Sequence, residues 1–157
     1  MKIETIAPIF FDFENDFVES LRCIPMIVRY KLDSCGIKLK LPEWVKISGE
    51  EKTQLAYLPC YLDSEIDCYA EFVKKLVWKY ASHEASLLAS VEDCWNNLHE
   101  VPEEVQAKAV EWNCPALKQK QWIELEILQR FALVKLSRSG HEGKNFPSAM
   151  QEFGLMR

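Results

Sequence analysis

Six cysteines and three histidines are the side chains of this sequence best suited to bind a metal. The chain has no Cys-x-x-Cys pair and no two histidines separated by three residues. Zinc and iron–sulfur sites usually take two ligands from one turn, so this spacing argues against a metal site. A chain of 157 residues that is 48% hydrophobic can also build its core without a disulfide framework. We therefore expect reduced thiols, most of them buried, with no metal and no cofactor.

Nucleophilic catalysis has one candidate, Cys23, whose neighbour Arg22 is able to lower the pKa of a thiol. The competing interpretation, which we favour, is that Cys23 packs beneath Leu21 and Ile24 as a small apolar residue. The acidic pairs at positions 50–51 and 103–104 fall in first helical turns, where carboxylates interact favourably with the helix dipole. The sequence thus predicts no catalytic residue.

A polar segment from Ser137 to Asn145 contains the materials of an anion-binding loop. Two serines and two glycines accompany three candidate ligands, Arg138, His141 and Lys144. The segment lacks the Walker pattern and follows a helix rather than a strand, which argues against a nucleotide loop. Two interpretations stay open: a site for a small anion, or a polar hinge between two helices.

The basic residues gather in one stretch of an acidic protein. The chain has a net charge of −5, whereas the segment from Arg22 to Lys46 has six bases and two acids. A net negative chain is atypical of a general nucleic-acid binder, and a local basic face suits an acidic protein or a small anion. The alternative is a solvated helix face. Our candidates for partner binding are Arg22, Arg29, Lys31 and Lys38.

The elements that must position these residues are predicted to be helices. Five glycines and little polar–apolar alternation leave few hairpins, whereas apolar residues recur at three- and four-residue steps. We expect an all-α, compact, single-domain bundle of about six to eight helices over residues 1–157. No stretch approaches the roughly 18 to 20 apolar residues that span a bilayer, and no secretory signal is visible. The sequence therefore predicts a cytoplasmic protein with no membrane partner.

Particular residues predict where the helices begin and end. Pro25 either kinks a helix or starts one, and Gly36 stops it. Ser48 and Glu51 form a capping box for a helix ending before Pro59. The stretch 37–41 alternates but has no obvious partner strand, so we expect a connector. Further helices are predicted over about 64–80, 87–98 and 117–137, with others starting near the prolines at 102 and 147.

Two parts of the chain have a similar pattern of residues, as an internal repeat would. Pro25, Val28 and Lys31 match Pro102, Val105 and Lys108 at an offset of 77 positions. Downstream, Trp44, Leu55 and Leu58 match Trp122, Leu133 and Leu136 at an offset of 78. Helical patterns match one another easily, so residues 25–58 and 102–136 are read either as a duplication or as a coincidence.

A long block at the start of the chain is the most specific pattern. It runs from Phe11 to Leu39, with Arg22-Cys23-Ile24-Pro25-Met26 at its centre, and resembles the nitrate reductase associated protein family of cyanobacteria and some other bacteria. The similarity extends over nearly the whole chain, through Trp44, Leu58-Pro59-Cys60, Gln129-Arg130-Phe131-Ala132-Leu133, Asn145-Phe146 and Glu152-Phe153-Gly154.

The resemblance implies a role in nitrate assimilation as an accessory to a molybdenum-cofactor nitrate reductase, helping that enzyme to mature or stay active. It transfers no catalytic residue to this chain. The first hypothesis is a protein-binding maturation factor that docks through its basic face. The second is a carrier of nitrate, molybdate or a pterin phosphate that uses the polar loop. An enzyme with a Cys23 thiolate comes third. An exposed apolar helix face would also support a homodimer.

Overall fold

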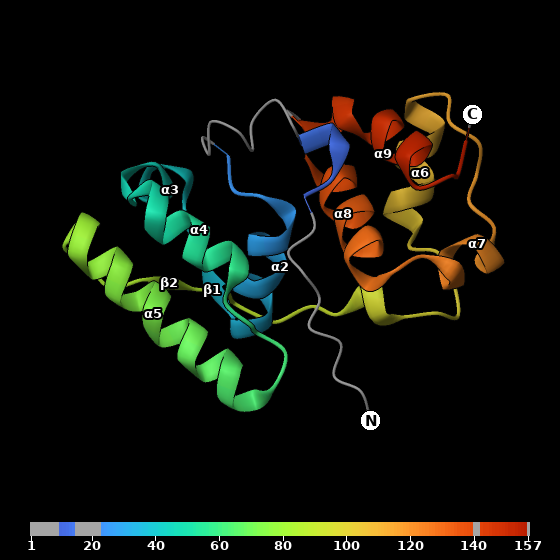
Figure 1. The fold of residues 1–157 in the computed structure, drawn as a ribbon. Helices are drawn as coiled ribbons and strands as arrows, with labels where there is room; N and C mark the ends of the chain where they lie inside the picture. Colours follow the sequence, from blue (N-terminus) through green and yellow to red (C-terminus); the bar gives the residue numbers. More distant parts are fainter. Residues whose placement is uncertain (1–9, 15–22, 140–141, 157) are drawn as a thin grey trace. The chain divides into compact units, whose positions relative to one another are not determined.

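The computed structural model describes residues 10–14, 23–139 and 142–156. These residues contain eight α-helices, α2 to α9, three short 3-10 helices and one two-stranded sheet (Figure 1). The prediction of an all-α protein is confirmed. Within the described ranges no helix is both long and apolar enough to cross a membrane.

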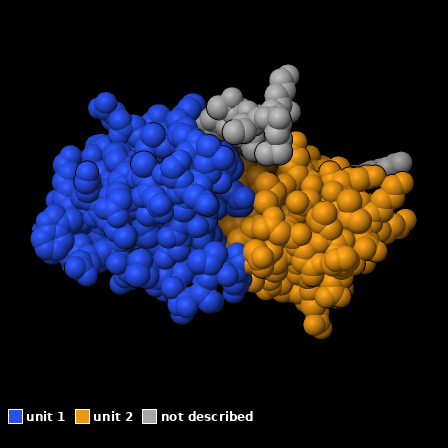
Figure 2. Space-filling model, turned by 90° about the horizontal axis from the view of Figure 1, so that it is seen from below, with its two compact units in different colours: residues 1–10, 14–92 blue, residues 11–13, 93–157 orange. Residues whose placement is uncertain are grey.

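The chain divides into two compact units, coloured separately in Figure 2. Unit 1 comprises residues 1–10 and 14–92, and unit 2 comprises residues 11–13 and 93–157. Single-domain behaviour stays a prediction.

Unit 1 is built around its longest helix, α5 (Asp63–Ala81), against which α2 (Met26–Cys35) and α3 (Leu41–Lys46) pack. Helix α4 (Gly49–Tyr57) packs on α2. Strand β1 (Ile37–Lys38) pairs antiparallel with β2 (Ser86–Leu87), so that Ile37 lies opposite Leu87. The large, fully buried side chains of this core are Met26, Ile27, Ile37, Trp44, Leu55 and Tyr69.

Unit 2 is built around α8 (Ile127–Arg138), which contacts α6 (Glu103–Glu111), η2 (Cys94–Asn96), η3 (Glu142–Asn145) and α9 (Phe146–Glu152). Helix α7 (Gln119–Glu124) precedes α8. The Trp95 ring meets the edge of Phe131 at 4.9 Å between centroids. The large, fully buried side chains here are Trp122, Phe131, Leu133, Leu136, Phe146 and Met150.

The predicted helix signals of the first half are largely confirmed. Pro25 is the N-cap of α2, and Gly36 ends that helix with φ of +72°. The Ser48 hydroxyl accepts from the amide of Glu51 at 3.1 Å, which confirms the N-cap half of the predicted capping box, and the Glu51 carboxylate accepts from the same hydroxyl at 2.8 Å. The helix after Ser64 begins one residue early, because the Glu65 carboxylate accepts from the amide of Leu62 at 2.8 Å.

Two predicted helices are wrong. Residues 87–98 form no α-helix: Leu87 pairs with Ile37 and supplies the strand partner that the 37–41 stretch lacked in the sequence, and Cys94–Asn96 form a short 3-10 helix. The helix predicted over 117–137 is broken into α7 and α8 at Leu125 and Glu126, which are extended. The Gln129 side chain caps the second piece by accepting from the amide of Glu126 at 2.9 Å.

The two units have the same order of elements over the predicted repeat. Helices α6, α7 and α8 begin 77, 78 and 78 residues after α2, α3 and α4. Both three-helix series start after a proline, and both middle helices bury a tryptophan, Trp44 or Trp122, completely. The left-handed residue Gly36 has its counterpart in Asn113, with φ of +56°. The duplication stays a prediction that this correspondence supports.

Gly36 and Gly49 provide a matched test of these helix ends. We expect Gly36→Ala to lower the free energy of unfolding by about 1–2 kcal/mol, because a Cβ disfavours positive φ. Gly49 lies at the start of α4 with open space around its Cα, so Gly49→Ala should be neutral or stabilise by up to about 1 kcal/mol. Urea unfolding measures both variants, and equal effects would contradict the assignment of Gly36.

Candidate functional site

Among the described bases of the basic segment, the exposed ones lie on β1, on α3 and at the N-cap of α3. Lys38, Lys40 and Lys46 are exposed there, beside two apolar side chains of α3, Leu41 and Val45, which are 50% and 52% exposed. Leu41 and Val45 are four residues apart and so share one face of the helix. We call these five residues the α3 surface.

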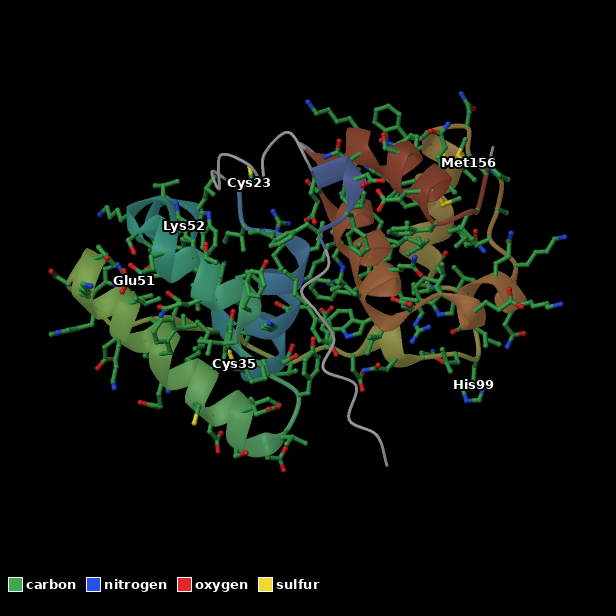
Figure 3. All side chains as sticks on the ribbon, in the orientation of Figure 1. Cys23, Cys35, Glu51, Lys52, His99 and Met156 are labelled. Carbon is green, nitrogen blue, oxygen red and sulfur yellow. The ribbon has the colours of Figure 1, made fainter. Side chains whose placement is uncertain are left out.

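The inner side of α3 fixes the orientation of this surface. Trp44 is fully buried, and the ammonium group of Lys52 lies 5.3 Å from the centroid of its ring. Figure 3 shows Lys52 on α4. The side chain of Glu43, the one acid within α3, is also buried. One of its oxygens accepts from the amide of Lys40 at 2.8 Å, and the other lies 3.3 Å from Nε2 of His83. The acid therefore points inward, and the exposed charges of α3 and its N-cap are basic.

Only one of the two predicted partner-binding arginines lies among the described residues. Arg22 lies outside the described residues. Arg29 is half-buried, and its Nε donates to the carbonyl of Ile24 at 3.0 Å, which closes the turn that leads into α2. Arg29 therefore has a local structural contact as well as its partly exposed guanidinium surface.

Lys31 is not on the surface where the sequence led us to expect it. Its side chain is 3% exposed, and Nζ donates to the carbonyls of Ala56 at 2.7 Å and Leu58 at 2.6 Å. These carbonyls end α4, and a helix leaves its last carbonyls without partners within the helix. Lys31 thus caps α4 from α2. The amphipathic position of Lys31 in the sequence gave no signal of this, because its partners lie 25 and 27 residues away.

The anion-binding candidates are not gathered around an open site in the described part of the chain. Both Nε and Nη2 of Arg138 donate to the carboxylate of Glu104 at 2.9 Å, a two-pronged ion pair between α8 and α6. Lys144 is exposed on η3, and His141 lies outside the described residues. The carboxylate of Glu104 occupies the guanidinium face that an anion would use.

The cysteines are free thiols, as expected, but the prediction that most of them are buried is wrong, because only Cys60 and Cys114 are. Cys23 is half-buried ahead of α2, as Figure 3 shows. Cys60 is buried and donates to the carbonyl of Lys31 at 3.6 Å, and burial raises the pKa of its thiol to about 12, which disfavours the reactive thiolate. Among the described residues, no group of three or more His, Cys, Asp and Glu side chains is placed to hold a metal.

Sequence reasoning missed the apolar half of the α3 surface and the buried cations. In the sequence, Leu41 and Val45 are as compatible with a buried helix face as Trp44 is. The structure buries Trp44 and leaves Leu41 and Val45 exposed, because the short helix α3 buries only one of its faces. Arg130 is buried in α8, where its Nε donates to the carbonyl of Trp95 at 2.6 Å and its Nη1 to that of Leu125. Lys52 and Arg130 are 78 positions apart, so the repeat offset was the one signal that related them.

Burial lowers the pKa of Lys31 from its ordinary 10.5 to about 8. Between these values the unfolded chain holds more protons than the folded chain, so this group makes the free energy of unfolding rise from about pH 8 to about pH 10.5. We expect Lys31→Met to lose that rise, as measured by urea unfolding at several pH values. Lys75→Met, at an exposed position of α5, is the control and should retain it. Parallel curves for wild type and Lys31→Met would contradict the assignment.

Comparison with known proteins identifies one family. The model of the conserved nitrate reductase-associated protein family matches residues 10–153 of the 157-residue chain. Comparisons with curated proteins and with solved structures gave no match. The resemblance read from the block between Phe11 and Leu39 is thereby confirmed.

Proposed function

The chain belongs to the conserved nitrate reductase-associated protein family, and from this premise we propose that it is a non-catalytic accessory protein of nitrate assimilation. In this proposal it binds a molybdenum-cofactor nitrate reductase in the cytoplasm and supports the maturation or the activity of that enzyme. The family description supports the association with the reductase, and the α3 surface supports the mode of binding.

The observation that carries the binding proposal is the composition of the α3 surface. Two adjacent apolar side chains, half exposed to solvent, lie among three lysines. Apolar groups supply affinity when they lose water at an interface, and charges at the rim steer and orient the partner. The partner surface that fits is therefore acidic with an apolar centre. Of the four partner-binding residues predicted from sequence, Lys38 remains in this surface.

Two of the other charged candidates have structural roles. Lys31 caps a helix, and Arg138 pairs with Glu104. Each of these groups thus stabilises the fold at the position where the structure places it. A homodimer through an exposed apolar helix face stays a second prediction, and size-exclusion chromatography of the purified protein distinguishes it from a monomer.

Charge reversal on α3 tests the binding mode. We expect Lys40→Glu combined with Lys46→Glu to weaken binding to purified nitrate reductase by about tenfold or more, because both lysines flank the apolar centre. The matched control is Lys118→Glu with Lys120→Glu at the α7 helix of unit 2, which should leave the Kd within about twofold. Surface plasmon resonance measures both, at two salt concentrations.

The accessory role has its own readout. Cells that lack the protein should show less nitrate reductase activity when grown on nitrate, and the α7 variant should restore that activity while the α3 variant does not. Restoration by the α3 variant, or unchanged binding to the purified reductase, would contradict the proposal.

A further inference from the structure

A second feature of unit 1 is a groove between the end of α4 and the first half of α5. Its walls are mainly apolar: Leu58 and Pro59 follow α4, and Cys68, Tyr69 and Phe72 come from α5. Its volume is about 430 Å³, enough for large side chains of a ligand to enter. The carboxylate-bearing Glu65 also lines it.

The groove is held open by buried contacts of its own walls. On the core side, Nζ of Lys31 donates a hydrogen bond to the carbonyl of Leu58 at 2.6 Å. The hydroxyl of Tyr69 donates to the carbonyl of Leu55 at 2.8 Å, and the Lys31 ammonium lies 6.0 Å from the centroid of the same ring. One wall and the floor are therefore tied together independently of any ligand. A preformed groove binds without the entropic cost of ordering its walls.

Apolar side chains near the groove are exposed to solvent. Leu58 in the wall is 37% exposed, and its neighbours Tyr57 and Leu62 are 61% and 47% exposed. Exposed apolar groups occur singly on most proteins, whereas a cluster beside a groove marks an interaction site. The groove thus offers an anchor point for an apolar side chain.

Acidic side chains outnumber basic ones around the groove, where the ammonium group of Lys31 binds the Leu58 carbonyl from the core side. From Thr53 to Val73 the chain contains four acids and no lysine, arginine or histidine. Glu65 lines the groove. Asp67 lies three positions after the lining residue Ser64, and Glu71 lies three positions after the lining residue Cys68. Residues three apart are neighbours on a helix surface, so each of these two acids lies next to a lining residue. Glu71 also pairs with Lys74 at 3.6 Å, and this contact is weak because both side chains are exposed to solvent.

We propose that this groove docks a basic peptide segment of a partner protein. An apolar side chain of the segment enters between Leu58 and Phe72, and its lysines or arginines face Glu65, Asp67 and Glu71. The α3 surface has the opposite charge, so unit 1 carries two interaction surfaces that select different partner segments. This inference goes beyond the proposed function and is independent of the identity of the reductase.

Two labelled peptides test the proposal on the full-length protein. One 12-residue probe contains only leucine and lysine in an amphipathic order, and the other has glutamate in place of each lysine. We expect the lysine peptide to bind at least about tenfold more tightly than the glutamate peptide in fluorescence anisotropy. Equal binding of the two peptides, or no binding of either, overturns the proposal.

Cys68 reports where the peptide binds. This thiol is exposed and lines the groove, whereas Cys94 is half-buried in unit 2 and serves as the internal reference. A saturating lysine peptide should slow the alkylation of Cys68 by iodoacetamide about fivefold or more, measured by mass spectrometry of the digested protein, and leave Cys94 unchanged. Unchanged alkylation of Cys68 overturns the proposal.

A charge-reversal pair completes the test. Asp67→Lys with Glu71→Lys should weaken binding of the lysine peptide by about tenfold, because both exposed carboxylates lie three positions from a lining residue of the groove. The control reverses two exposed acids of unit 2, Glu100→Lys with Glu111→Lys, and should change the Kd by less than about twofold. Equal losses in both variants would show a response to net charge alone and would overturn the proposal.

Discussion

Buried cations that bind the last carbonyls of short helices are the constraint on which much of this structure depends. Lys31 reaches the carbonyls of Ala56 and Leu58 in unit 1, and Arg130 reaches those of Trp95 and Leu125 in unit 2. A buried carbonyl without a partner costs free energy, and a buried ammonium or guanidinium group costs more unless its donors are used. Each cation and its carbonyls therefore satisfy one another, and the ends of α4 and α7, helices of nine and six residues that are marginal alone, are held in place.

The same helix ends decide which charges reach the surface. Glu43 and Glu65 each accept from an N-cap amide through one carboxylate oxygen, and Glu51 accepts from the hydroxyl of the N-cap Ser48. On α3 the acid is turned inward and the lysines remain outside, whereas on the first half of α5 further acids remain outside. Unit 1 consequently presents a basic surface around α3 and an acidic groove between residues 58 and 72. Opposite charges on separate faces allow one small unit to distinguish partner segments by electrostatic complementarity.

The two units correspond in their buried tryptophans and helix caps as well as in the order of their helices. Trp44 and Trp122 are both fully buried in six-residue helices, and both helices begin with a side chain at the third position that accepts from the N-cap amide at 2.8 Å. Yet Lys52 lies over the ring of Trp44, while Arg130 at the matching position binds backbone carbonyls. The scaffold is thus shared, and the way in which a buried cation is satisfied differs with the length and shape of its side chain.

The sequence by itself determined the helical class, the family, the N-cap at Ser48 and the stop at Gly36, because these depend on local spacing and backbone preference. It also located the basic segment. Only the tertiary structure decided which members of that segment are exposed: Lys31 turned inward because the carbonyls that it caps come from residues far along the chain. The strand at Leu87 and the break at Glu126 were equally invisible, since the first needs Ile37 as a partner and the second depends on Arg130 taking up carbonyls of the preceding helix. Contacts between distant residues carry no local pattern, and these contacts determined which side chains were left to form a site.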